Sequence, residues 1–325
     1  MGVLIDGKWT DGELPQETSE TGQFKRVDSS FRSRVTADGS SGFKAEAGRY
    51  HLYVAHGCPW AHRTLIYRAL KGLEGIISVA YSIPGLRTEG WTYEDDPRYP
   101  DCVPDKVNGV HYLHEAYTAS NPDYTGKVTV PMLWDKKTRR IVNNESSEII
   151  RMLNSAFDGI TGNRADYYPP ALRAEIDAVN ERVYRNVNNG VYRAGFAKSQ
   201  QAYDEAYDGL FATLDWLEER LSRQRYLVGN RITEADWRLF PSLVRFDAIY
   251  YVAYKCNLRR LDEYPNLSGF LRELYQTPGI AAACDIAGMK RGVYSKAGPV
   301  GGNGIVPVGP VVDLTRPHDR DRFAS

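Results

Sequence analysis

The sequence predicts an α/β half followed by an all-helical half. Strand-like runs at residues 49–55 and 76–82 flank a helical stretch from about residue 59 to 71, and strand, helix, strand begins a βαβ unit. Beyond a linker at residues 167–170, apolar residues recur at spacings of three and four, which is typical of helices. With 325 residues the chain is long enough for about two domains.

The order of segments along the chain predicts two domains between terminal extensions. Residues 1–46 are rich in Gly, Ser, Thr, Asp and Glu, and predict an extended arm with little regular structure. The α/β domain spans residues 47–160. Its segment 84–128 is too long for an ordinary connection and predicts a functional insertion with one helix near 112–119. The helical domain spans 168–295, and the Gly/Pro-rich tail at 296–325 carries no helix signal.

The second part of the α/β domain reads as a β-hairpin followed by a helix. Residues 128–135 and 140–143 are the two strands, and a helix begins at residues 144–147. Pro131 lies in the first strand-like run, where its missing N–H is awkward. A turn or a cis peptide bond before Pro131 would resolve this conflict.

The helical domain contains two long helices and one clear helix start. Thr233 is followed three residues later by Asp236, a near capping box. The apolar positions of the two helices are Leu172, Ile176, Val179, Val183 and Val187 in the first, and Tyr203, Tyr207, Leu210, Leu214, Leu217 and Leu221 in the second.

Composition disfavours several classes of function. Lys plus Arg and Asp plus Glu both number 41, and this balance argues against nucleic-acid binding and against an electrostatic membrane anchor. No apolar run approaches the ~18 residues that span a bilayer, and the N-terminus does not resemble a signal peptide. The four cysteines are too dispersed for a metal site or a disulfide framework, which predicts a reducing, cytoplasmic setting.

Cys58 is the informative cysteine. It precedes Pro59 at the junction of a strand and a helix, where unpaired N–H groups and the helix dipole favour a thiolate and lower the thiol pKa. Because residue 61 is Ala61, a disulfide at Cys58 has no local resolving partner and needs an external thiol. The alternative is a buried inert cysteine. The other cysteines, Cys102, Cys256 and Cys284, are interpreted as structural.

Cys58, Pro131 and the Glu145-Ser146 helix start together resemble the glutathione transferase superfamily. The resemblance implies a thioredoxin-like N-terminal domain followed by an all-helical C-terminal domain. The run from Cys58 to Arg63, CPWAHR, resembles the signature of glutathionyl-hydroquinone reductases, the Xi class, and the likeness extends over residues 31–310. One departure is Gly57, which predicts a looser loop before the nucleophile.

The resemblance implies how glutathione is held as a co-substrate, without a metal. The backbone of Val130 would pair with the cysteinyl part, while Glu145 and Ser146 would hold the γ-glutamyl end. Trp91 would lie against glutathione, and Arg98 would lie near the glycyl carboxylate. The alternatives are a simple helix cap for Glu145 and Ser146 and exposed loop residues for Trp91 and Arg98.

Three tyrosines assigned to the helical half resemble the family's substrate-site tyrosines. Tyr192 and Tyr294 are the expected catalytic hydrogen-bond donors, and Tyr250 is an expected binding residue. Phenols can flank a hydroquinone ring and donate to its oxygens. Each could instead be a core residue, and Tyr251 and Tyr254 are close enough in sequence to be confused with Tyr250.

The expected reaction is glutathione-dependent reduction of glutathionyl-hydroquinones through a mixed disulfide at Cys58. The resemblance also implies a homodimer. Two alternatives remain open: an Omega-like thioltransferase or dehydroascorbate reductase, which also uses a single cysteine, and a non-enzymatic transferase-like scaffold, which the presence of Cys58 disfavours.

Overall fold

The computed structural model of this chain describes residues 2–12, 17–83, 89–97, 99–296, 298–300 and 303–323. It divides into two compact units, each built from three separate stretches of chain. Unit 1 comprises Met1–Pro15, Val27–Ala165 and Ala287–Val306, and unit 2 comprises Gln16–Arg26, Asp166–Ile286 and Pro307–Ser325.

A four-stranded sheet with the order β6-β5-β8-β9 forms the centre of unit 1. Strand β5 (Tyr50–Val54) is buried along its whole length and pairs in parallel with β6 (Ser78–Tyr81). On its other side it pairs antiparallel with β8 (Met132–Asp135), which pairs with β9 (Arg140–Asn143). The predicted βαβ start and the predicted hairpin are both confirmed.

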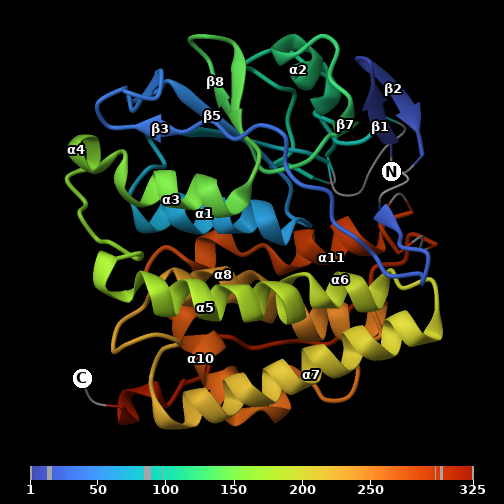
Figure 1. The fold of residues 1–325 in the computed structure, drawn as a ribbon, viewed down its shortest axis with the longest axis vertical. Coiled ribbons are helices and arrows are strands. Elements are labelled where there is room, and N and C mark those ends of the chain that lie inside the picture. Colours follow the sequence, from blue (N-terminus) through green and yellow to red (C-terminus); the bar gives the residue numbers. More distant parts are fainter. Residues whose placement is uncertain are drawn as a thin grey trace. The chain divides into compact units, whose positions relative to one another are not determined.

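Helices cover both faces of this sheet. Helices α1 (Pro59–Leu70) and α3 (Ser146–Ser155) lie side by side on one face, and α2 (Leu113–Ser120) lies on the other (Figure 1). Short α4 (Asp158–Thr161) follows α3, and nearly all of α11 (Ile286–Tyr294) also belongs to unit 1. This arrangement of strands and helices confirms the predicted thioredoxin-like domain.

The N-terminal arm contains more regular structure than predicted. Asp6 and Gly7 both have positive φ, 47° and 73°, and close a tight hairpin of the kind that Asp-Gly favours. The expectation of an arm with little regular structure is therefore wrong, because Asp6-Gly7 forms a turn that lets β1 and β2 pair. The strands concerned are β1 (Gly2–Ile5), β2 (Lys8–Asp11) and β7 (Gly126–Lys127) in one sheet, and β3 (Val35–Thr36) and β4 (Phe43–Lys44) in another.

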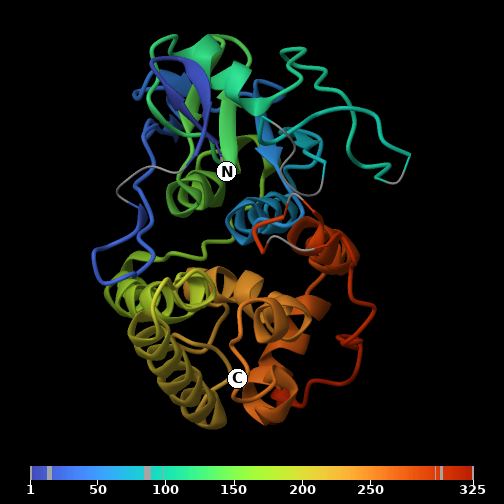
Figure 2. The ribbon, with the colours of Figure 1, turned by 90° about the vertical axis from the view of Figure 1, so that its right-hand side faces the viewer.

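The long connection between β6 and β8 contains the predicted helix, α2. Tyr112 is its N-cap, and Glu115 accepts hydrogen bonds from the backbone N–H groups of His111 and Tyr112. A bridge between Thr92 and Tyr112 ties the two ends of the intervening loop together. Part of this loop, coloured teal in Figure 2, extends away from the sheet.

Unit 2 is helical, as predicted. The start of α8 is the predicted capping box: Thr233 donates its N–H to Asp236 Oδ2 at 2.7 Å, and burial raises the pKa of Asp236 to about 6. The helices are α5 (Arg173–Val183), α6 (Gly190–Gly195), α7 (Gln200–Arg223), α8 (Glu234–Arg245), α9 (Tyr251–Ala253) and α10 (Pro265–Gln276), with π-helical turns η3 (Tyr184–Asn188) and η4 (Phe246–Tyr250) and 3-10 turns η2 (Pro170–Leu172), η5 (Leu261–Glu263), η6 (Ala281–Ala283) and η7 (Arg320–Arg322).

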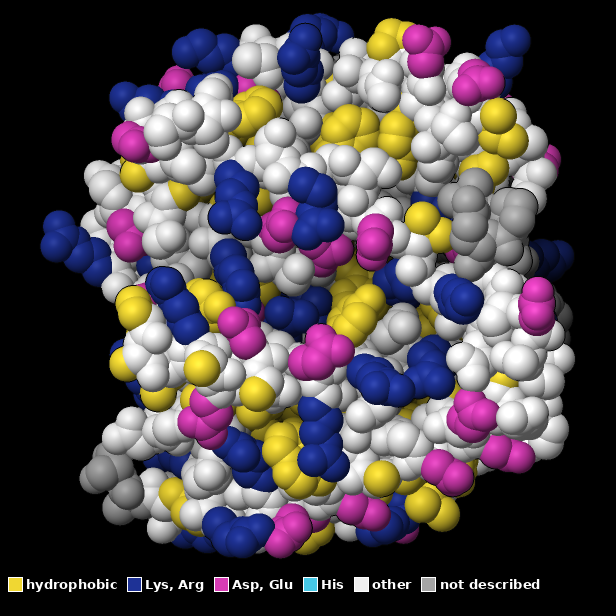
Figure 3. Space-filling view, viewed as in Figure 1, with side chains coloured by type: hydrophobic (Ala, Val, Ile, Leu, Met, Phe, Trp, Pro, Cys, Tyr) yellow, Lys and Arg dark blue, Asp and Glu magenta, His cyan; other side chains and the backbone are white. Residues whose placement is uncertain are grey.

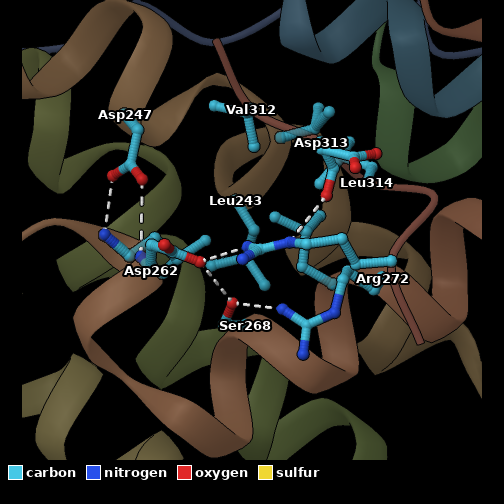
Figure 4. Close-up of a pocket in the computed structure, with 12 residues that line it drawn as sticks. Leu243, Asp247, Asp262, Ser268, Arg272, Val312, Asp313 and Leu314 are labelled. Atoms are coloured by element: carbon cyan, nitrogen blue, oxygen red, sulfur yellow. Dashed lines mark hydrogen bonds and ion pairs between the residues drawn. The ribbon is translucent and has the colours of Figure 1, made fainter. Parts of the chain in front are cut away.

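The C-terminal tail is held to unit 2 by polar contacts. Arg316 pairs with Asp262 at 2.7 Å, and Ser268 hydrogen bonds with Asp262 and with Arg272 (Figure 4). Further along, the fully buried Arg320 donates to the carbonyl oxygens of Leu221, Gln224 and Arg225 around the end of α7. Carbonyls at a helix end lack partners within the helix, so Arg320 stabilises this end of α7.

The surface matches the balanced charge of the sequence. Figure 3 shows Lys and Arg side chains interspersed with Asp and Glu over the face that it draws. Within the described part of the chain, no helix combines the length and the apolar composition that crossing a bilayer requires.

Candidate active site

Cys58 is the N-cap of α1, as the sequence predicted. Its backbone is extended, with φ −87° and ψ 112°, and its Sγ accepts the N–H of Ala61 at 3.4 Å. The thiol is half-buried. An N–H from the first helical turn that points at sulfur stabilises a negative charge there, so the local geometry favours a nucleophilic thiolate.

The segment before β8 lies directly beside this sulfur. The peptide bond between Val130 and Pro131 is cis, one of the two solutions expected from the sequence. Cys58 Sγ donates to the Val130 carbonyl at 3.3 Å, and Val130 is buried. Cys58 and Val130, 72 positions apart in the sequence, therefore form one site.

Glu145 and Ser146 begin helix α3. Glu145 is its N-cap and accepts the backbone N–H of Ser147 at 3.0 Å and its hydroxyl at 2.9 Å, while Ser29 donates to the other carboxylate oxygen at 3.1 Å. Burial raises the pKa of Glu145, but the hydrogen bonds from Ser147, the charge of Arg63 and the Ser29 hydroxyl outweigh it, so the net pKa is lowered. Glu145 is thus an anion beside a helix N-terminus, suited to a ligand ammonium group.

Arg63 is a site residue to which the sequence analysis assigned no role. It is 2% exposed, its Nη1 lies 3.4 Å from Ser146 Oγ, and its guanidinium lies over the Trp60 ring at 4.6 Å. It therefore connects helix α1, which Cys58 begins, to the start of α3. One feature of the sequence could have indicated this role of Arg63: it is a charged residue near the start of a predicted helix whose other residues are mostly apolar.

The insertion brings one of its two predicted residues to this region. The indole N–H of Trp91 donates to the Val128 carbonyl at 3.2 Å, two residues before Val130. Trp91 is half-buried and so lies along the segment that leads to the cis peptide bond. Arg98 lies outside the described residues.

Helix α11 packs against the loop that leads to Cys58. A Cβ atom at Gly292 would lie 2.9 Å from Gly57 Cα, and one at Gly57 would lie 3.3 Å from Gly292 Cα. The prediction of a looser loop is therefore wrong: Gly57, which lacks a side chain, lets the backbone of this loop lie close to Gly292 of α11. Tyr294, two residues further on, is 9% exposed and belongs to unit 1 rather than to the helical half to which the sequence analysis assigned it.

Tyr192 and Tyr250 meet within unit 2. Their rings are 6.2 Å apart, and Tyr254 joins them at 5.5 Å from Tyr192 and 5.2 Å from Tyr250. Burial, and then the neighbouring Tyr192, raise the pKa of Tyr250 well above its usual value. Tyr251 instead lies under Arg260, so Tyr254, not Tyr251, completes this tyrosine cluster.

Comparisons with known proteins agree with this geometry. The family model described as "Glutathione S-transferase, N-terminal domain" matches residues 57–156, and the one described as "Glutathione S-transferase, C-terminal domain" matches residues 200–273. The chain is 52% identical to the glutathionyl-hydroquinone reductase PcpF of Sphingobium chlorophenolicum over 97% of this chain and 98% of PcpF. The chain belongs to the glutathionyl-hydroquinone reductases, the Xi class of glutathione transferases.

Solved structures of this class have the same fold. The glutathione-bound structure of YqjG from Escherichia coli K-12 is 47% identical with a TM-score of 0.89, covering 99% of this chain and 100% of that one. The Xi-class transferase of Natrialba magadii is 42% identical with a TM-score of 0.91, covering 100% of this chain and 98% of that one. The predicted fold class is thereby confirmed.

The other cysteines of this Xi-class chain differ from Cys58 in environment. Cys102 is 1% exposed and donates to the Ser82 carbonyl. Burial raises the pKa of Cys256 and of Cys284 to about 12 in each case. The thiols of Cys256 and Cys284 therefore stay protonated near neutral pH, which makes them poor nucleophiles.

The geometry at the start of α1 leads to a prediction about the Cys58 thiol. The alkylation rate of Cys58 with iodoacetamide, followed by mass spectrometry, is expected to titrate with a midpoint below the ~8.5 of free cysteine. In the Ala61→Cys variant, part of the mixed disulfide is expected to become an internal bond with Cys58, which slows turnover at limiting glutathione. A midpoint at or above ~8.5 would show that the helix start does not activate the thiol.

Proposed function

We propose that this protein reduces glutathionyl-hydroquinones to hydroquinones through a mixed disulfide between Cys58 and glutathione. The observation that carries the proposal is the position of Cys58 Sγ, which lies 3.4 Å from the Ala61 amide and 3.3 Å from the Val130 carbonyl. A single activated thiol beside a backbone that can pair with a peptide suits an exchange reaction with a glutathionyl group.

Glutathione is proposed to bind along unit 1. Its cysteinyl backbone would pair with Val130, and its γ-glutamyl ammonium would meet the Glu145 carboxylate. Its γ-glutamyl carboxylate would accept from Ser146 and from the N-terminal amides of α3. Buried Arg63, beside Ser146, supports this arrangement because it adds a positive charge near the expected carboxylate. Trp91 would lie along the peptide.

The first chemical step breaks a carbon–sulfur bond. The Cys58 thiolate attacks the sulfur of the glutathionyl-hydroquinone, a sulfur–sulfur bond forms, and the electron pair of the broken bond goes to the aromatic carbon or its keto tautomer, which takes up a proton. Tyr192 and Tyr294 are proposed to donate hydrogen bonds to the ring oxygen as charge develops there. Tyr250 would contact the ring.

A second glutathione completes the cycle. Its thiolate attacks the glutathionyl sulfur of the mixed disulfide, which releases oxidised glutathione and regenerates the Cys58 thiolate. The aromatic carbon gains the two electrons that the two glutathione sulfurs lose. Because the chemistry is divided by a covalent intermediate, ping-pong kinetics are expected.

A turnover assay with a panel of glutathionyl-hydroquinones and with dehydroascorbate tests this function. Release of hydroquinone with one oxidised glutathione per turnover, and with parallel lines in double-reciprocal plots, is the expected result. A preference for dehydroascorbate over every member of the panel would instead assign the chain an Omega-like activity.

Replacing Glu145 with glutamine tests the proposed glutathione site. Loss of a charge-assisted hydrogen bond to the ammonium is expected to raise the KM for glutathione by about ten- to a hundredfold, with little change in kcat at saturation. Glu148→Gln is the matched control, because this carboxylate lies on the same helix but pairs with Arg32 at 2.6 Å. A normal KM in Glu145→Gln, or an equal rise in the control, would contradict the assignment.

The compartment and the assembly are also proposals. The wide spacing of the four cysteines along the sequence, which does not suit a disulfide framework, supports a reducing, cytoplasmic setting. A homodimer is expected from the family resemblance, and sedimentation or light scattering of the purified chain would measure it directly.

A further inference from the structure

A short hairpin in the N-terminal arm, residues 17–26, belongs to unit 2. Thr18 and Phe24 form an antiparallel bridge, Gln23 donates its N–H to Ser19 Oγ at 2.9 Å, and Lys25 donates its N–H to a backbone carbonyl at 2.8 Å. We call this segment the arm hairpin. It is separated in sequence by more than 140 residues from the helices of the unit that it joins.

Several contacts fix the arm hairpin to the region around α6 and the start of α7. Two involve its backbone carbonyls, one a side-chain amide and one a pair of aromatic rings. They are Lys198 N to Gly22 O at 2.9 Å, Ser199 Oγ to Thr21 O at 2.8 Å, Gln23 Nε2 to Glu205 Oε2 at 2.7 Å, and the rings of Phe24 and Phe196 at 5.5 Å. These contacts hold the arm hairpin beside α6 and α7, and Arg26 is its last residue.

Arg26 lies on the tyrosine cluster. Its guanidinium carbon is 5.1 Å from the centroid of the Tyr192 ring, and its Nε donates to Asn189 Oδ1 at 3.2 Å. The Tyr192 ring also packs against the rings of Phe196, Tyr250 and Tyr254, which are side chains that carry no positive charge. Arg26 thus adds a fixed positive charge to a tyrosine that has a proposed catalytic role.

We propose that Arg26 is a positioning residue that strengthens the Tyr192 hydroxyl as a hydrogen-bond donor. A cation over an aromatic ring interacts with its π-electrons and is attracted still more strongly when the phenol oxygen gains negative charge. Donation to a developing oxyanion on the substrate ring shifts negative charge onto the phenol, so Arg26 stabilises the transition state more than the ground state. This inference rests on the proposed function and concerns the same reaction.

A double-mutant cycle between Arg26 and Tyr192 tests the inference. In Arg26→Ala, kcat for a glutathionyl-hydroquinone is expected to fall about two- to fivefold, the range for a cation–π contact at an exposed site. The KM for glutathione should not change. Arg26→Lys, which keeps the charge, should retain most of the activity. In the Tyr192→Phe background, Arg26→Ala should cause no further loss.

Lys25→Ala is the matched control, since it removes a cation from the neighbouring hairpin position, and it should behave as wild type. Equal losses from Arg26→Ala in the presence and absence of the Tyr192 hydroxyl would overturn the inference, as would a loss in Arg26→Lys as large as that in Arg26→Ala. If the wild-type protein is active, either of these two outcomes contradicts the role of Arg26 and leaves the proposed function intact. A wild-type protein that is inactive on every glutathionyl-hydroquinone contradicts both the role of Arg26 and the proposed function.

Discussion

Replacing Cys58 with serine is expected to reduce the turnover of glutathionyl-hydroquinones by at least about 10³-fold, because the Cys58 thiolate is the proposed nucleophile and a hydroxyl cannot form the mixed disulfide. The Cys58→Ala variant should lose turnover to the same extent. Thermal unfolding should remain close to wild type, since Cys58 contributes only half-buried contacts at the N-terminus of α1. Initial rates at saturating glutathione measure the effect.

The matched control for this variant is Cys284→Ser. Cys284 is also half-buried, but burial raises its thiol pKa to about 12, so its loss should leave turnover near wild type. Incubation of the wild-type protein with oxidised glutathione should add one glutathionyl mass that maps to Cys58. Near-normal activity in Cys58→Ser, or a mass that maps to Cys102, Cys256 or Cys284, would reassign the nucleophile.

Removing the hydroxyl of Tyr192 or Tyr294 is the second large expected effect. Each Tyr→Phe change is expected to lower kcat for glutathionyl-hydroquinones by roughly ten- to a thousandfold, the range for losing one donor to a developing oxyanion. Glutathione affinity, measured by titration of the resting enzyme, should change little because these residues are proposed to act on the aromatic half of the substrate. Equal losses in glutathione binding would mean that the tyrosines shape the whole pocket.

Tyr251→Phe provides the control for these variants. Tyr251 is the immediate neighbour of Tyr250, but it contacts Arg260 rather than the tyrosine cluster, and its hydroxyl should be dispensable. A loss in Tyr251→Phe comparable to that in Tyr192→Phe would indicate that general packing of this region, rather than hydrogen-bond donation, controls kcat.

The features that sequence reasoning predicted correctly are those with a local cause. A cysteine followed by proline predicted the N-cap of α1, because proline suits the first helical turn. A proline inside a strand-like run predicted an unusual backbone, and the bond before Pro131 is cis. Thr233 and Asp236 predicted a helix start from their spacing. Each of these constraints acts within four residues, so it can be read without the fold.

The sequence by itself therefore determined the two kinds of domain, the position of Cys58 at a helix start, and the second helix start, beside which glutathione is proposed to bind. The tertiary structure decided which distant residues assemble around these features: Arg63 with Ser146, Gly57 with Gly292, and Arg26 with Tyr192. These pairs are 83 to 235 positions apart, and no local pattern specifies such contacts. The choice between Tyr254 and Tyr251 has a local cause: Tyr254 lies four residues after Tyr250 and so on the same helical face, whereas Tyr251 follows directly and faces another side. Only the tertiary structure brings Tyr192, 58 positions before Tyr250, to meet both rings of this pair.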